Sequence, residues 1–257
     1  MDWYSYPLLI AAGFVSGFVN TLAGSGSAVT LPVLIFLGLP AHVANGTNRV
    51  AIVLQNVSAV WTFGRRGALD LPGALWLSVP AVLGSIVGAQ FSLRLDEATM
   101  RQVIGGVMLL MLVVILLRPS RWLEGAVLEM AARPNWKHML LFFFIGIYGG
   151  FIQVGVGIFM LAGLVLGIGY DLVRANAVKV AVVLAFTTVA LGVFVWNGRV
   201  QWREGLILAA GSMLGAWVGA RFAVEKGAIW VRRLLIAIVL FSAAQLLGVL
   251  DWLGQLL

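Results

Sequence analysis

Four long stretches of this chain contain no Asp, Glu, Lys or Arg. They run from Trp3 to Asn48, Leu71 to Leu93, His138 to Tyr170 and Val180 to Gly198. Each stretch is long enough for at least one membrane-spanning helix of about 20 residues. Hydrophobic residues make up 61% of the 257 residues and charged residues 11%, so the apolar side chains exceed what one soluble core can bury. The sequence therefore predicts an all-α polytopic membrane protein and excludes a water-soluble enzyme.

The net charge of +7 does not indicate a nucleic-acid partner in a chain of this kind. Its Lys and Arg residues lie almost entirely between apolar segments, where they orient the chain and contact anionic lipid. The chain has no cysteine, and neither His42 nor His138 has acidic or histidine neighbours at metal-ligand spacing. We expect the lipid bilayer as a partner, and no nucleic acid, metal site or cofactor.

The sequence contains an internal repeat. A shift of 133 residues superposes four residues of the first half on the second, and a shift of 131 residues continues the register over about 90 residues. This pattern predicts two repeats of about five hydrophobic segments, covering residues 1–117 and 138–257, with a polar linker at 118–137. Equivalent helices carry small-xxx-small glycine pairs, which favour close helix packing and leave a homodimer through one of these faces open. The matched residues and glycine pairs are Gly13, Gly17, Phe18 and Gly24 with Gly146, Gly150, Phe151 and Gly157; Gly38, Ala44, Asn45 and Gly67 with Gly169, Ala175, Asn176 and Gly198; and Gly84 and Gly88 with Gly215 and Gly219.

The distribution of cations predicts the orientation of the repeats. If the first two segments of each half both cross, or form one re-entrant hairpin, each half crosses the membrane an odd number of times and the second half is inverted. One side of the membrane then receives 12 of the 17 Lys and Arg residues, whereas an even number of crossings divides them almost equally. The positive-inside bias favours inverted repeats, a cytoplasmic linker and both termini outside the plasma membrane.

Each half contains a break near its start. Asn20 to Ser27 interrupts apolar sequence with small and polar residues, and the equivalent stretch from Gln153 to Gly157 is also rich in glycine. The apolar segments that follow, Ala28 to Leu39 and Ile158 to Ile168, are too short for a full crossing. Backbone groups freed by broken or re-entrant helices must face protein or a water-filled cavity. The paired breaks therefore predict a central site, and helix amino ends pointing at it would prefer an anion.

The third segment of each half adds a cation. Arg49 follows Asn45, and Lys179 follows Asn176, by about one helical turn. Ionisable groups inside membrane spans usually line a pathway. The alternative interpretation is that both cations lie near helix ends and extend to lipid headgroups.

All ten carboxylates lie at segment ends or in loops, which disfavours a sodium, proton or metal-ion pump. Asp171 and His42 are candidates for a protonatable group at the rim, although a solvated cap is the more common role. Ser25 could instead be the nucleophile of an intramembrane serine hydrolase. That alternative lacks a base within a later span.

The break Gly17 to Ser27, the following Leu31-Pro32 and the motif Ala44 to Asn48 resemble the sulfite exporter TauE/SafE family. The resemblance implies a bacterial plasma-membrane permease that exports sulfite or organosulfur anions such as sulfoacetate. Family members often have a glycine-richer break than Gly24 to Ser27, and Thr-Ser where this chain has Thr47-Asn48. Because these positions are expected to contact the substrate, a permease for a different small anion is the main alternative.

These observations predict a substrate-binding site at the meeting point of the broken helices. Glycines and Ser25 would supply backbone donors, neutral side chains would add hydrogen bonds, and two cations would supply countercharge. The predicted residues are Asn20, Gly24, Ser25, Gly26, Asn45, Thr47, Asn48, Arg49, Gln153, Gly157, Asn176 and Lys179.

Overall fold

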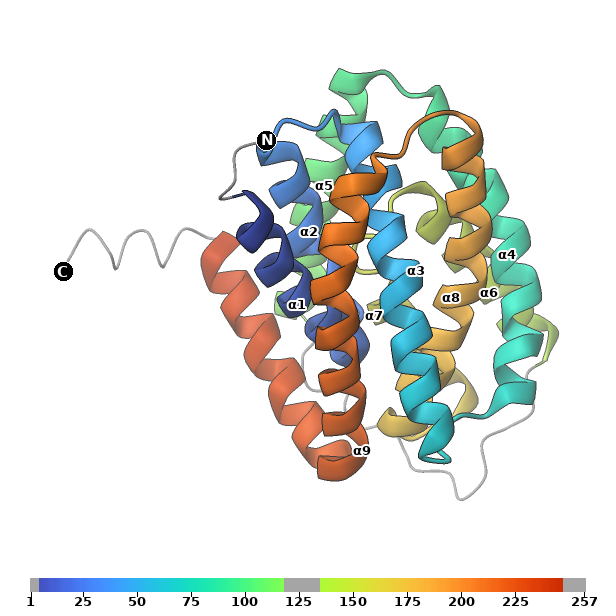
Figure 1. Cartoon of the computed structure of the whole chain (residues 1–257). Coiled ribbons are helices and arrows are strands. Elements are labelled where there is room, and N and C mark those ends of the chain that lie inside the picture. The colour runs from blue at the N-terminus through green and yellow to red at the C-terminus, as the bar shows by residue number, and fades with distance from the viewer. Residues whose placement is uncertain (1–4, 118–134, 247–257) are drawn as a thin grey trace.

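The computed structural model describes residues 5–117 and 135–246, and these form helices joined by short turns, with no strand among them (Figure 1). The helices are α1 (Ser5–Ala23), α2 (Ser27–Phe36), α3 (Ala41–Arg65), α4 (Leu71–Arg94), α5 (Glu97–Leu117), α6 (Trp136–Phe151), α7 (Val156–Ala162), the π-helix η1 (Gly163–Ile168), α8 (Leu172–Trp196) and α9 (Trp202–Leu246).

The all-α polytopic architecture is confirmed. Within the described residues, α1, α4, α8 and the Trp202–Glu225 part of α9 are long and apolar enough to cross a membrane. Helix α3 is equally long, but its buried polar residues lower its mean hydropathy. It packs against α8 and α9, so a polar helix is enclosed by more apolar ones (Figure 1).

Local sequence explains where several helices begin. The Asp70 carboxylate accepts a hydrogen bond from the Gly73 amide, and Asp171 accepts from the amides of Val173 and Arg174. Asp171 is therefore the N-cap of α8, as the cap interpretation expected. Asn135 and His138 form a reciprocal capping box at the start of α6.

One boundary differs from the sequence prediction. The linker was predicted to end at residue 137, but the Asn135 cap starts α6 at Trp136; residues 118–134 lie outside the described part of the chain. The last two predicted segments both fall within the element α9. Figure 1 shows its orange and red parts as two arms that meet at the lower end of the view, so α9 folds back on itself between them.

The first two helices of each half fold back on each other. Leu9 near the start of α1 packs with Leu34 and Leu39 at the far end of α2, so α1 and α2 form a hairpin. Near the start of α6, His138 Nε2 lies 3.2 Å from the Gly167 carbonyl oxygen at the end of η1. The second pair, α6 with α7–η1, is therefore also a hairpin. The inverted relation of the two halves stays a prediction.

The glycine faces serve packing within the chain. Gly84 and Gly88 of α4 lie against the α6 backbone at Phe143 and Ile147, and Gly215 of α9 lies against the α1 backbone at Phe14. A Cβ at any of these glycines would overlap that backbone. Because both faces are covered, the homodimer contact that we left open for them is not available.

Candidate functional site

The tips of the two hairpins touch. The Gly157 amide donates a hydrogen bond of 3.1 Å to the Gly24 carbonyl, which is a direct backbone contact between the two predicted breaks. Gly24 has φ +77°, a left-handed conformation that favours glycine. A Cβ on Gly157 would overlap the Gly24 backbone. Glycine is thus required at both positions for a close approach.

Lys179 of α8 binds the carboxyl end of α1. Its Nζ donates to the carbonyl oxygens of Asn20 at 2.9 Å and Thr21 at 2.8 Å, and to Asn176 Oδ1 at 2.6 Å. Carbonyls at the last turn of a helix carry the negative end of the helix dipole, and here the Asn20 carbonyl accepts from Lys179 in addition to the Gly24 amide. A cation from the second half therefore stabilises the broken helix of the first half.

Arg49 of α3 makes the reciprocal contact. Its guanidinium donates to the carbonyl oxygens of Gly149 at 3.1 Å and Gly150 at 2.6 Å, at the carboxyl end of α6. It also donates to Gln153 Oε1 at 3.3 Å and lies 4.7 Å from the centre of the Phe194 ring. A cation from the first half therefore stabilises the broken helix of the second half.

Both cations are inside the protein. Arg49 has 0% and Lys179 has 1% of its surface exposed, so neither head group extends to the lipid headgroups as the alternative interpretation required. Among the ion pairs of the described residues, none involves Arg49 or Lys179. Their charge is balanced only by neutral oxygens and one aromatic ring, which leaves two buried positive charges beside the hairpin tips.

Gln153 connects Arg49 to the second half of the chain. Its Oε1 accepts from Arg49, and its Nε2 donates to Thr187 Oγ1 at 2.6 Å. Gln153 adopts a left-handed backbone with φ 55°, unusual for a residue other than glycine. Such strain persists where surrounding contacts determine the conformation, and here two side-chain hydrogen bonds do so.

The asparagines of α3 bind different elements. Asn48 accepts from Thr30 Oγ1 at 2.6 Å and donates to Ser27 Oγ at 3.2 Å, which fixes α2 against α3. Asn45 donates to the Phe151 carbonyl at the end of α6. Thr47 instead accepts from the Gln201 amide at 2.9 Å in the α8–α9 connection, so it lies apart from the hairpin tips.

The remaining predicted residues lie at the first break. Ser25 is half-buried at the tip, and Gly26 packs on Ser16 and Asn20. The Gly24 amide donates to the Asn20 carbonyl and the Gly157 amide to Gly24, so both amides already have acceptors in this conformation. A role for these backbone donors toward a substrate stays a prediction.

The sequence prediction missed the groups that hold the cations. Backbone carbonyls of Thr21, Gly149 and Gly150 have no signature of their own, because every residue carries one. The hydroxyls of Ser27 and Thr30 could have been found, since a polar residue in an apolar segment must find a hydrogen-bond partner. Thr187 was expected to form an interhelical hydrogen bond, and it does so with Gln153.

Three buried polar side chains at the site, and Gln55 further along α3, retain unused hydrogen-bonding capacity within the described chain. The unpaired donors are Arg49 Nε and Asn176 Nδ2; Asn45 Oδ1 is an unpaired acceptor, and both polar atoms of Gln55 lack a partner. Buried polar groups without partners are rare and point to a ligand, water or another state of the protein.

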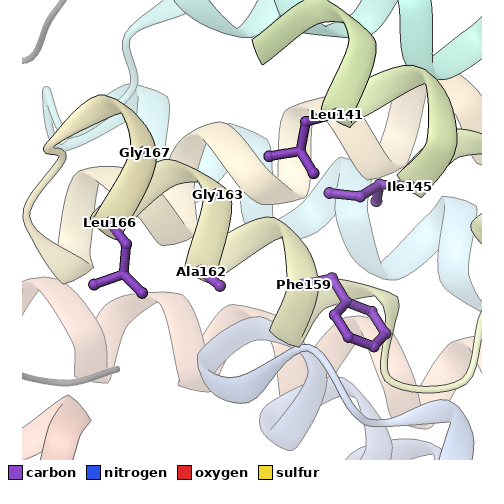
Figure 2. Close-up of a pocket in the computed structure, with 7 residues that line it drawn as sticks. All are labelled: Leu141, Ile145, Phe159, Ala162, Gly163, Leu166 and Gly167. Atoms are coloured by element: carbon purple, nitrogen blue, oxygen red, sulfur yellow. The ribbon is translucent and has the colours of Figure 1, made fainter. Parts of the chain in front are cut away.

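A cavity of about 430 Å³ lies on a different face, along α6, α7 and η1 (Figure 2). Its lining consists of Leu141, Ile145, Phe159, Ala162, Gly163, Leu166 and Gly167. Figure 2 shows only carbon in the side chains that face it. None of its lining residues belongs to the polar site at the hairpin tips. Its lining side chains offer no hydrogen-bond donor to an anion.

Comparison with known proteins identifies the family of this chain. The family model described as sulfite exporter TauE/SafE matches residues 9–246. The probable membrane transporter protein ORF9 of Sinorhizobium is 28% identical over 96% of this chain and 94% of its own length. A probable membrane transporter protein of Haemophilus influenzae is 28% identical over 95% of both chains, and YfcA of Escherichia coli K12 is 26% identical over 97% and 96%. No solved structure matches the chain significantly. The chain is thus a multi-pass membrane transporter rather than an enzyme, and it belongs to the sulfite exporter TauE/SafE family.

Proposed function

We propose that this transporter exports a small anion, sulfite or an organosulfur anion such as sulfoacetate, through the site where its two hairpins meet. The observation that carries the proposal is the pair of buried cations, Arg49 and Lys179, without a carboxylate partner in the described chain. A cation in the middle of a bilayer costs ~3 kcal/mol on insertion scales. Neutral carbonyls offset part of that cost but leave the net charge in place, and a bound anion would compensate it.

The unpaired donors support the same site. A small oxyanion needs several hydrogen-bond donors around it, and Arg49 Nε and Asn176 Nδ2 are buried donors at the site that lack acceptors. The neutral amides give orientation without adding charge. Two cations suffice for attraction while keeping binding weak enough for release.

The proposed transport cycle uses the hairpins as moving parts. In the described conformation the tips are in contact at Gly24 and Gly157, so the path between the two sides is closed there. We propose two inverted repeats, residues 1–117 and 138–257, whose hairpins separate at one end at a time, with the tip glycines as hinges. An inside-negative potential of 100 mV favours expulsion of one negative charge by ~2.3 kcal/mol. Export can therefore run downhill without a coupling ion.

The first prediction is sulfite flux from proteoliposomes. Saturable efflux by the wild type should fall by roughly 100-fold in Arg49→Ala and Lys179→Ala at matched incorporation, because each loses a charged contact of ~3 kcal/mol. Exposed cations provide matched controls: Arg65→Ala on the same helix as Arg49, and Lys137→Ala, should retain wild-type flux. Sulfoacetate and other small anions are compared in the same assay. If another anion is transported and sulfite is not, the substrate is a different small anion. Unchanged flux in both cation variants would refute the proposed binding site.

The second prediction concerns orientation in the bacterial plasma membrane. Because the chain has no cysteine, single cysteines can be labelled without background. We expect Ser120→Cys, in the proposed cytoplasmic linker 118–137, to be protected from an impermeant thiol reagent added to whole cells. Asn197→Cys, in the exposed α8–α9 connection, should react. The reverse pattern would contradict the proposed orientation with both termini outside.

A further inference from the structure

His42 joins three elements at one end of the molecule. It lies in the first turn of α3, where its Nδ1 is 2.8 Å from Glu97 Oε2 at the start of α5. Its Nε2 is 2.8 Å from a terminal nitrogen of Arg199, in the connection between α8 and α9. Figure 1 shows the starts of α3 and α5 and the α8–α9 connection together at the upper end. The imidazole therefore links the first half of the chain to the second.

The chemistry of the partners assigns the protons of this ring. A guanidinium has only donors, so His42 Nε2 must be an acceptor toward Arg199. A neutral imidazole that accepts at Nε2 carries its proton on Nδ1, which lies 2.8 Å from Glu97 Oε2 without hydrogen-bond geometry toward it. The contact with Arg199 therefore requires a neutral imidazole with its proton on Nδ1.

The His42 ring is accessible to water, and it contacts one negative group, Glu97, and one positive group, Arg199. The side chains of His42 and Glu97 are 18% and 37% exposed. Glu97 also accepts from the Ala41 amide at 2.6 Å and pairs with Arg101 at 3.3 Å. The other charged groups at this end are Arg94 of α4, Asp96 before α5, and Arg203 and Glu204 of α9; of these, Asp96 binds Thr99 and Arg203 binds Tyr6.

The opposite end is held together without a histidine in the described chain. Tyr170 donates to Asp70, and Arg66 and Arg221 pair with Glu225. Burial, reinforced by the Asp70 carboxylate, raises the pKa of the Tyr170 hydroxyl, so Tyr170 stays a neutral donor even as the pH rises above neutrality. His138 bonds only groups of the second half, the Asn135 amide and the Gly167 carbonyl. A histidine between the halves is found at one end of the described structure.

We propose that His42 is a protonation site that strengthens the contact between the two halves at this end only while its ring is neutral. A proton taken from solution binds Nε2, which is the atom that accepts from Arg199. The imidazolium is attracted to Glu97, whose Oε2 lies 2.8 Å from Nδ1, but now presents N–H to N–H across 2.8 Å to a second cation. Arg199 loses its acceptor and is repelled, so the contact of α3 with the α8–α9 connection is weakened, although the Thr47–Gln201 hydrogen bond remains.

This inference rests on the proposed transport function and adds regulation of that transport by pH. Histidine is the side chain that most often changes charge near neutral pH, which is a range that a cell surface experiences. In the proposed orientation this end faces outward. Acid outside would weaken the closure there and favour the outward-open state. The proton acts on closure and need not travel with the anion.

The first test, and the third prediction, compares the pH profile of flux in three proteins. With only the outer face of wild-type proteoliposomes changed from pH 8 to pH 6, the rate should rise by roughly two- to fivefold, the range that a partly exposed charged contact supports. His138→Gln is the matched control and should keep this rise. His42→Gln retains a hydrogen-bonding side chain without a titration near neutrality, and its rate should not change with pH. A rise preserved in His42→Gln would overturn the proposal.

The second test does not depend on transport. In His138→Gln, His42 is the sole histidine, so nitrogen NMR of the labelled ring reports its tautomer directly. At pH 8 we expect the proton on Nδ1, and in a further Arg199→Gln variant we expect that preference to weaken. A proton on Nε2 at pH 8 would refute the assigned hydrogen bonds. If sulfite flux is absent but the Nδ1 tautomer is seen, the substrate proposal fails and the protonation site is supported.

Discussion

The Gly157→Ala variant is expected to lose transport and to unfold at a temperature lower by roughly 2–10 °C. The new methyl group would overlap the Gly24 backbone where the two hairpin tips touch. Overpacking of a closely packed site costs ~1–3 kcal/mol, and in a domain of this size each kcal/mol shifts the midpoint by about 2–4 °C. Because the neighbour is backbone rather than a flexible side chain, local relaxation gives little relief. The fluorescence of the chain's tryptophans during heating measures the midpoint in detergent.

Gly192→Ala is the matched control. Gly192 lies inside α8, has open space where a Cβ would go and does not have a positive φ. Alanine there should leave flux unchanged and raise stability by up to ~1 kcal/mol, since glycine is the poorer helix former. If Gly157→Ala behaves like Gly192→Ala, the tips do not meet in the folded protein.

The breaks in the helices could be predicted from the sequence because they are local. Glycine and polar residues inside an apolar run disfavour a continuous helix, and they do so wherever the chain goes next. The stretches at Asn20 to Ser27 and Gln153 to Gly157 therefore indicated two helix breaks, although they left open whether the flanking segments form hairpins. The polar face of α3 and the glycine faces of α4 and α9 were found for the same reason, since helical periodicity is visible in any single segment.

The partners of the charged residues could not be predicted because they are distant and generic. Arg49 binds carbonyls about 100 residues away, and backbone carbonyls are identical at every position. His42 was interpreted as a solvated cap more readily than as a connection, because Glu97 and Arg199 come near it only after α3, α5 and α9 have packed. Pairs that depend on tertiary packing leave no pattern in spacing.

The cations themselves yield the second large effect. Lys179→Met and Arg49→Met keep most of the side-chain volume but remove the donors that bind the ends of α1 and α6. In each variant two or three carbonyl oxygens lose a charged donor, which lowers stability. The cost of burying the charge is removed at the same time and offsets part of this effect, so we expect a net loss of ~2–4 kcal/mol. Arg49 and Lys179 share no hydrogen-bond acceptor, so the stability losses should add in the double variant.

Transport should not follow that additivity. If both cations act on one anion at one site, either substitution removes the balanced charge, and the double variant should transport no worse than the slower single variant. Midpoints of thermal unfolding and sulfite flux are measured on the same four proteins, with Arg65→Met as the exposed control on α3. Additive stability with non-additive flux distinguishes a shared binding site from two separate structural caps. Losses that add in both measurements would show that each cation only stabilises its own broken helix, because two independent caps lower flux by independent factors.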